Sequence, residues 1–209
     1  MFRRSRLQRS GRLGKVQEVD EWETHMDLTG QLLIAMPGMG DARFDRSVVL
    51  ICSYSDEGAM GLILNKPMPN MTMQDVFERL EMTVTSGPAD AQVHIGGPVQ
   101  TERGFFLHCD GTRTTGEPMT IPGGYMLSAT QGILRDTGLG DGPDPFIFAL
   151  GYSGWGPGQL DREISQNGWL TAPARADLVF ANDDDVLWEA ALRSIGINPV
   201  SLSSAAGRA

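Results

Sequence analysis

Five residues of the 209-residue chain could help to hold a small ligand because of their side-chain type and their position: Asn65, Lys66, Gly97, His108 and Trp155. Lys66 is the only lysine after residue 15, so its ammonium group could pair with a carboxylate or a phosphate, although an ordinary surface ion pair would use the same charge. His108 could act as a general base because histidine titrates near neutral pH, although a hydrogen-bonded core histidine would look the same in sequence. No residue is assigned a catalytic role.

Two glycine-rich bends could bring backbone amides close to a ligand, because glycine allows a close approach of the main chain. Residues 154–158 (GWGPG) hold Trp155 in a bend before a predicted helix, where exposed amides could bind an anion. Alternatively, the indole ring fills the core beneath that loop. Residues 96–98 (GGP) match neither a dinucleotide-binding fingerprint nor a phosphate-binding loop. We expect the connections at Asn65, Gly97 and Trp155 to surround one shared hollow.

Several other motifs do not meet the requirements of catalysis or metal binding. Ser153 is followed two residues later by Trp155, whereas a nucleophile elbow needs glycine at that position. His108 and Cys109 are neighbours on a predicted strand, so their side chains point to opposite faces and cannot easily share a zinc ion. The acidic residues 183–185 lie at a predicted helix start, where carboxylates cap the helix. We therefore expect neither a metal nor a cofactor.

Charge is distributed unevenly along the chain. Six of the 17 basic residues lie within residues 1–15, which contain no acidic residue, so the rest of the chain carries 11 basic and 26 acidic residues and a net charge of −15. Such a body repels a nucleic-acid backbone, because nucleic-acid affinity is mostly electrostatic. Direct DNA binding is therefore not expected, and only the basic arm could contribute to it.

The two ends of the chain are expected to lie outside the folded domain. Residues 1–26 form a basic extension that should be disordered, and residues 201–209 form a small polar tail that should fray. Met26 precedes the first predicted strand, so translation from that codon is a hypothesis that the mass of the native protein would test.

Hydrophobicity and cysteine content predict the cellular compartment of the protein. The apolar runs are far shorter than the ~18 residues that a membrane span needs, so we expect no membrane insertion. The basic arm lacks the apolar region of a secretory signal. With only two cysteines, both in apolar runs, the chain is predicted to be cytoplasmic.

Hydrophobic patterning predicts the elements that would position the candidate residues. Apolar runs predict strands at residues 31–36, 48–54, 60–66, 92–95, 104–109, 125–127 and 145–150. Helical spacing and capping residues predict helices at residues 72–82, 129–137, 157–168 and 183–196. Strands and helices intermingle without regular alternation or a linker, which indicates a single α+β domain over residues 27–200.

Several segments together resemble the AlgH/YqgE family of bacterial proteins: residues 31–37 (QLLIAMP), 58–67 (GAMGLILNKP), 96–99 (GGPV), 103–108 (RGFFLH), 151–160 (GYSGWGPGQL) and 167–170 (NGWL). The resemblance implies a single α+β domain in which a bifurcated mixed sheet folds into a barrel-like core with helices packed outside. The family has no assigned biochemical activity, and its name comes from a proposed role in transcriptional control of exopolysaccharide production. Tyr54 departs from the pattern, because the family has histidine there.

Two functions from different classes remain open at this point. The first is a non-enzymatic cytosolic module that binds a small ligand or a protein partner and acts at most indirectly in transcriptional regulation. The alternative is a hydrolase or transferase acting on a small anionic metabolite, with Asn65, Lys66, His108 and the Trp155 bend lining one pocket. We favour the binding module, because the sequence contains no recognisable nucleophile motif.

Overall fold

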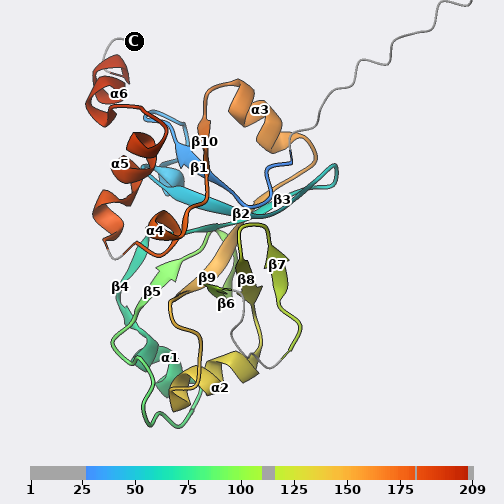
Figure 1. Ribbon diagram of the computed structural model, residues 1–209, viewed down its shortest axis with the longest axis vertical. Coiled ribbons are helices and arrows are strands. Elements are labelled where there is room, and N and C mark those ends of the chain that lie inside the picture. Colours follow the sequence, from blue (N-terminus) through green and yellow to red (C-terminus); the bar gives the residue numbers. More distant parts are fainter. Residues whose placement is uncertain (1–26, 110–115, 182, 207–209) are drawn as a thin grey trace, which may run out of the picture.

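The computed structural model describes residues 27–109, 116–181 and 183–206, which form an α+β domain built on one curled sheet (Figure 1). Its strands are β1 (Gln31–Ala35), β2 (Val48–Ser55), β3 (Gly58–Ile63), β4 (Pro67–Thr72), β5 (Gln92–Ile95), β6 (Val99–Cys109), β7 (Met119–Ile121), β8 (Tyr125–Ser128), β9 (Phe146–Trp155) and β10 (Trp169–Pro173). The sheet forms a half-barrel with helices around it, which confirms the predicted fold class. The basic arm of residues 1–26 lies outside the described residues.

Helices surround this sheet on several sides. They are α1 (Met73–Arg79), α2 (Gln131–Leu139), α3 (Gln159–Ser165), α4 (Ala176–Val179), α5 (Asp184–Ser194) and α6 (Pro199–Ala206), with one 3₁₀ turn, η1 (Ala42–Phe44). In Figure 1, α1 and α2 lie together at the lower end of the molecule, α3 lies at the upper end, and α4, α5 and α6 lie along one side. Within the described residues, none of the helices combines the length and the apolarity needed to cross a membrane.

The sheet forks at strand β9. The strand order is β10–β1–β2–β3–β9–β6–β8–β7, and all of these neighbours are antiparallel. Strand β5 pairs with β9 in parallel and with β4 antiparallel. One edge of β9 is therefore shared, because residues 148–150 pair with β5 and residues 153–155 pair with β3. This arrangement confirms the bifurcated sheet implied by the family resemblance.

The backbone of Gly96 and Gly97 fills the fork. The amide of Gly96 donates to the carbonyl oxygen of Leu150 at 2.8 Å, and the carbonyl oxygen of Gly96 accepts from the amide of Ile63 at 2.9 Å. Gly97 has a φ of +155°, and a Cβ atom there would lie 2.2 Å from the carbonyl carbon of Tyr152. Because no side chain fits so close an approach, the bend requires glycine.

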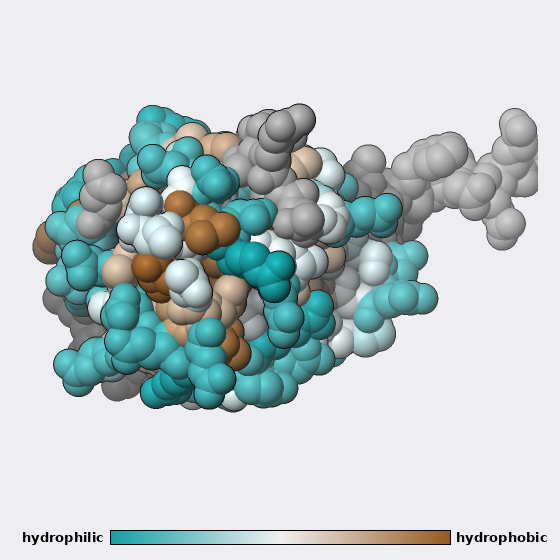
Figure 2. Space-filling model, turned by 90° about the horizontal axis from the view of Figure 1, so that it is seen from below, coloured by the Kyte–Doolittle hydropathy of each residue, from teal (hydrophilic) through white to brown (hydrophobic). Residues whose placement is uncertain are grey.

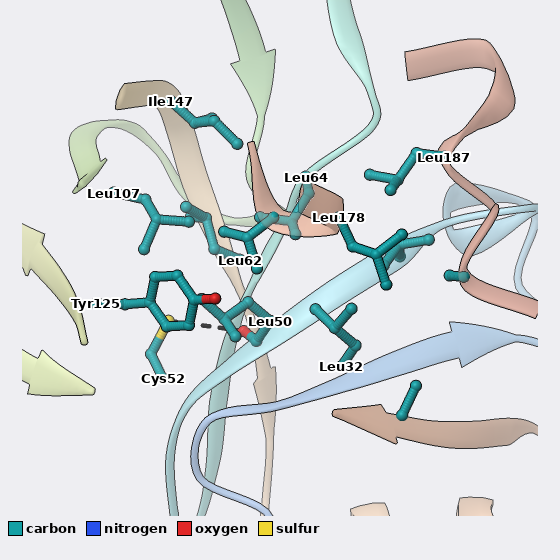
Figure 3. Packing of buried hydrophobic residues seen from close by; sticks show 14 of the residues in the cluster. Leu32, Leu50, Cys52, Leu62, Leu64, Leu107, Tyr125, Ile147, Leu178 and Leu187 are labelled. Atoms are coloured by element: carbon teal, nitrogen blue, oxygen red, sulfur yellow. Dashed lines mark hydrogen bonds between the residues drawn. The ribbon is translucent and has the colours of Figure 1, made fainter. Parts of the chain in front are cut away.

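Both faces of the β1–β2 part of the sheet are buried. On β1, Leu32 and Ile34 face a core cluster that includes residues of α4 and α5, whereas Leu33 and Ala35 face a second cluster that includes Leu160 of α3. Figure 3 shows the first cluster, in which side chains from both halves of the curled sheet meet. Burial on two faces explains why these strands are continuous apolar runs.

A third core cluster lies beneath α1 and α2. Phe77 of α1 and Ile133 of α2 are fully buried in it and pack with Phe106 and Phe148 of the sheet. The predicted start of α1 is confirmed, because Thr72 and Asp75 form a capping box at its first turn. The two helices therefore cover the face of the sheet that is formed by β5, β6 and β9.

Some elements differ from those predicted from the sequence. β4 is not predicted because it contains Pro67 and Pro69, which disfavour strands, and it pairs with β5 only at its two ends. β7, β10 and α4 are three to five residues long and give too short a pattern. β9 continues past the expected end to Trp155, because the glycines in its second half interrupt the apolar run without ending the pairing with β3.

Helix α6 extends into the segment predicted to fray. Asn198 starts this helix, because its Oδ1 accepts a hydrogen bond from the amide of Val200 at 3.1 Å. Pro199 occupies the first helical position, where its missing amide hydrogen costs nothing. Leu202 packs against the first core cluster, so a tertiary contact anchors the first turn of this helix.

Candidate functional site

A pocket of about 730 Å³ opens between the β2–β3 hairpin, β6, β9 and the chain that leads into α2. We call it the central pocket. Its lining includes three aromatic and three charged side chains, which are Phe105, Tyr152, Trp155, Glu57, Arg103 and Glu117. Volumes of about 300 to 1,000 Å³ and a mixture of apolar and polar walls are typical of small-molecule sites.

Aromatic rings and one arginine shape the wall of the central pocket that is formed by β6 and β9. The rings of Phe105 and Tyr152 meet edge to face with their centroids 6.0 Å apart. The guanidinium carbon of Arg103 lies 5.1 Å from the centroid of the Phe105 ring, a distance typical of a cation–π contact. Phe105 is only 4% exposed and packs in the first core cluster, so the partly exposed Tyr152 supplies the apolar surface of this wall beside the positive charge of Arg103.

Trp155 forms a second wall of the central pocket, and its position is held by hydrogen bonds. It is the last residue of β9 and pairs with Ala59, so it lies on a strand and not in the bend that the sequence predicted. Its indole nitrogen donates to Oε2 of Glu163 at 2.9 Å, and Trp169 donates to the same oxygen at 2.8 Å. This shared acceptor explains the exposure of only 6% for the Trp155 side chain.

A second pocket lies on the other side of Trp155. It has a volume of about 590 Å³ and is lined by the loop after β1, by α3 and by the residues that follow α3. Trp155 and Gly154 line both pockets. Of the five predicted residues, Trp155 is thus the one that lies on the wall of the central pocket.

Asn65 and Lys66 lie in the connection that follows β3 and bind main-chain atoms of another loop. Asn65 is 8% exposed; its Oδ1 accepts from the amide of Val48 at 2.8 Å, and its Nδ2 donates to the carbonyl oxygen of Arg46 at 2.9 Å. The ammonium group of Lys66 donates to the carbonyl oxygen of Asp45. Both side chains therefore fasten the loop before β2 to the end of β3, away from the lining of the central pocket.

Gly97 and His108 are also engaged in packing. Gly97 lies in the fork of the sheet against the main chain of Tyr152, and neither Asn65 nor Gly97 lines the pocket that Trp155 lines, so the expectation of a hollow shared by these three connections is wrong. His108 is fully buried on β6; its Nδ1 lies 2.9 Å from the carbonyl oxygen of Cys109, and its Nε2 lies 2.9 Å from Oγ of Ser128. Neither residue lines the central pocket.

The structure also places residues that sequence reasoning did not select. Arg103 and Tyr152 line the central pocket, and both stand in segments that carried the family resemblance, which was the available signal.

Asp183 caps α5 as expected, because its Oδ1 accepts from the amide of Asp185 at 3.1 Å. Asp184 instead pairs with His94 of β5 at 3.0 Å, a contact between residues 90 positions apart.

Comparison with known proteins connects this chain to bacterial relatives along most of its length. The profile of the AlgH-like family matches residues 32–200. A UPF0301 protein of Cereibacter sphaeroides is 48% identical over 184 residues, covering 88% of this chain and all of the relative. A UPF0301 protein of Ruegeria pomeroyi is 50% identical over 185 residues, again covering 88% of this chain and all of the relative.

Solved structures show the same architecture. The solution structure of the AlgH protein from Pseudomonas aeruginosa matches with a TM-score of 0.72 at 34% identity, covering 87% of this chain and 95% of that protein. The crystal structure of protein DIP2367 from Corynebacterium diphtheriae has a TM-score of 0.65 at 22% identity and supports the fold alone. From the family profile and these relatives, the chain belongs to the AlgH-like family.

Proposed function

We propose that this protein is a non-enzymatic binding module that takes up a small ligand in the central pocket. The observation that carries this proposal is an open volume of about 730 Å³ with Phe105, Tyr152 and Trp155 in its walls. Aromatic rings supply much contact area at little conformational cost, and Arg103 supplies a charge that fixes orientation. A ligand with a flat apolar part and polar groups fits such walls, because Glu57 and Glu117 line the pocket together with Arg103.

The arrangement of hydrogen bonds favours binding over catalysis. The alternative, a hydrolase or transferase acting on a small anionic metabolite, rested on Asn65, Lys66, His108 and Trp155. All four side chains form hydrogen bonds to other atoms of the protein. A reaction through these groups would have to break contacts that hold the fold together.

The proposed role in the cell follows from charge and thiol content. The chain has only two cysteines, Cys52 and Cys109, both in apolar runs, which supports a reducing compartment such as the cytoplasm. A net charge of −15 outside the first 15 residues opposes direct contact with DNA, so any part in transcriptional regulation would be indirect, through a ligand or a protein partner.

A thermal-shift screen of metabolites tests the proposal. A ligand that binds only the folded state raises stability by mass action, by about 2.7 kcal/mol at a hundredfold excess over its Kd. Tyr152→Ala should abolish the shift, because it removes one aromatic wall of the central pocket. Tyr54→Ala is the matched control, because it also removes a partly buried tyrosine but from outside this pocket.

Two results would contradict the proposal. If an active compound stabilises Tyr152→Ala as strongly as the unchanged protein, the ligand does not occupy the central pocket. If mass spectrometry shows that the protein converts the compound into a product, the enzymatic alternative replaces the binding module.

A further inference from the structure

A second, more apolar opening lies between α1, α2 and the sheet. This α1–α2 crevice has a volume of about 430 Å³. The apolar side chains that line it include Val76, Leu80, Phe106, Leu134, Phe148 and Leu150. Figure 2 looks onto this end of the molecule and shows hydrophobic side chains gathered at its centre within a hydrophilic surround.

The end of α1 and the start of α2 border the crevice, away from the place where the chain after α1 meets the end of α2. Beyond α1, the amide of Thr85 donates to the carbonyl oxygen of Gly138 at 3.0 Å, and a Cβ atom at Gly138 would lie 3.4 Å from Cε1 of Phe77. The last turn of α1 and the first turn of α2 instead stand on opposite sides of the opening, at Leu80 and Gln131. Leu80 is 53% exposed, so apolar surface is left uncovered there.

Two arginines stand at this opening. Arg79 comes from α1 and Arg103 comes from β6, and none of the ion pairs formed within the described residues includes either side chain. Glu102 is the carboxylate in the same lining. Within this lining, two positive charges against one negative charge contrast with the strongly acidic body of the protein, although Asp75, one turn before Arg79 on α1, also interacts with Arg79. The crevice is therefore complementary to a single anionic group attached to an apolar body.

We propose that the α1–α2 crevice binds an amphipathic carboxylate, with its hydrocarbon tail between α1 and α2 and its head group at Arg79 and Arg103. A guanidinium group suits this role because it matches a carboxylate with two parallel hydrogen bonds and is weakly hydrated. The tail gains affinity from the apolar area that it removes from water. This site goes beyond the proposed function, because Arg79 and the six apolar residues named above do not line the central pocket, although Arg103 lines both cavities.

The probe is decanoate. Decanol and decyltrimethylammonium, whose tails are of equal length, are the comparison ligands. Each ligand is added to the full chain below its micelle concentration. Isothermal titration calorimetry should show decanoate binding about tenfold or more tighter than decanol, and no binding of the cation. Arg79→Gln should weaken decanoate binding about tenfold and leave decanol binding unchanged, and Arg79→Lys should restore part of the loss. Arg193→Gln on α5 makes the same charge change far from the crevice and should have no effect.

A second variant tests the tail without threatening the fold. Leu80→Ser alters an exposed side chain and should weaken decanoate and decanol by the same factor of about three to ten. Tyr152→Ala should leave decanoate binding unchanged. If Tyr152→Ala abolishes decanoate binding and Arg79→Gln does not, the anion sits in the central pocket; this inference is then overturned while the proposed function stands.

Other outcomes overturn the inference for stated reasons. Equal affinities for decanoate and decanol would show an apolar crevice without anion recognition. Capture of the protein by anionic phospholipid vesicles, without binding of monomeric decanoate, would show a membrane-facing surface. A dimer that Leu80→Ser dissociates and that excludes decanoate would show that a second copy of the chain covers the crevice.

Discussion

Tyr54 occupies the position where the family resemblance led us to expect histidine, and it connects two elements. Its hydroxyl group donates a hydrogen bond to Oδ1 of Asp161 at 2.5 Å, which links β2 to α3. This hydrogen bond, reinforced by burial and by the negative charge of Asp161, raises the pKa of Tyr54 to about 12. A role that depends on imidazole chemistry does not transfer to this position, because a phenol remains neutral at physiological pH.

Titration of Tyr54 gives a prediction with a defined sign. Because its pKa is about 12 in the folded protein and 10.0 in the reference state, the protonated hydroxyl favours folding. This contribution is complete below pH 10 and is lost as the pH rises through about 12. Spectrophotometric titration at 295 nm should show a late-ionising tyrosine that is absent from Tyr54→Phe.

Asp161→Asn is the control for this titration, because it removes the negative charge but leaves an acceptor oxygen. Tyr54 should then ionise earlier than in the unchanged protein. An unaltered late ionisation in Tyr54→Phe would assign that step to another tyrosine, for example Tyr125, whose pKa is raised by burial.

The two cysteines should differ sharply in reactivity. Cys52 is 1% exposed, and burial raises the pKa of its thiol to about 12, so little reactive thiolate forms at neutral pH. Cys109 is partly exposed at the end of β6. Under native conditions a thiol reagent such as 5,5′-dithiobis(2-nitrobenzoate) should label one cysteine rapidly, and Cys109→Ser should remove that reaction. Rapid labelling of Cys109→Ser would show that the core around Cys52 opens.

Residue chemistry alone could predict only part of the candidate site. Trp155 was selected because a large ring next to glycines must either bind or pack, and in the structure it packs in the second core cluster and also lines the central pocket. Lys66 and His108 could not be assigned in the same way. Their partners, the carbonyl oxygen of Asp45 and the hydroxyl group of Ser128, come from segments 20 or more positions away. A sequence shows that a polar group exists but not which distant atom satisfies it.

At the scale of elements, the sequence predicts best where a pattern is strong. β1 and β2 are buried on both faces, and their continuous apolar runs identify them. α5 begins at its predicted capping residue, Asp183, and α2 begins two residues after its predicted start at residue 129. β4 and β10 depend instead on partners supplied by distant strands, so their local sequence carries a weak signal.

The fork of the sheet gives a prediction about stability. Gly97→Ala would force a Cβ atom to 2.2 Å from the carbonyl carbon of Tyr152 and should lower the free energy of unfolding by about 3 kcal/mol. Gly40→Ala is the matched control, because nothing lies within 4 Å of its added Cβ. That change should alter stability by less than about 1 kcal/mol. Equal denaturant midpoints for the two variants would show that the fork is not tightly packed.

At the scale of the whole molecule, the half-barrel was accessible only through the family resemblance. Local patterns give a list of strands and helices and hence the α+β class, but they do not state which strands pair. The fork depends on β9 meeting β5 on one part of its edge and β3 on the next. Such long-range pairings are chosen by the packing of the complete core, of which Figure 3 shows part of the first cluster, and by the glycines at the fork.

The uneven charge of the molecule gives a prediction about nucleic acid. A chain that lacks residues 1–15 keeps 11 basic and 26 acidic residues and should not bind duplex DNA at physiological salt. Any weak binding by the full chain should come from the basic arm and fall steeply as salt increases. Fluorescence anisotropy of a labelled duplex, measured for both chains at several salt concentrations, checks this. Equal affinity of the two chains for DNA would contradict it.

Arg103, Ala129 and Thr130 line both the central pocket and the α1–α2 crevice. These residues therefore separate the two cavities. The guanidinium group of Arg103 can pair fully with only one bound anion at a time. An anion that recruits Arg103 from one side should compete with an anion on the other side without overlapping it in space. Because such linkage is reciprocal, each occupant should weaken the binding of the other by the same factor.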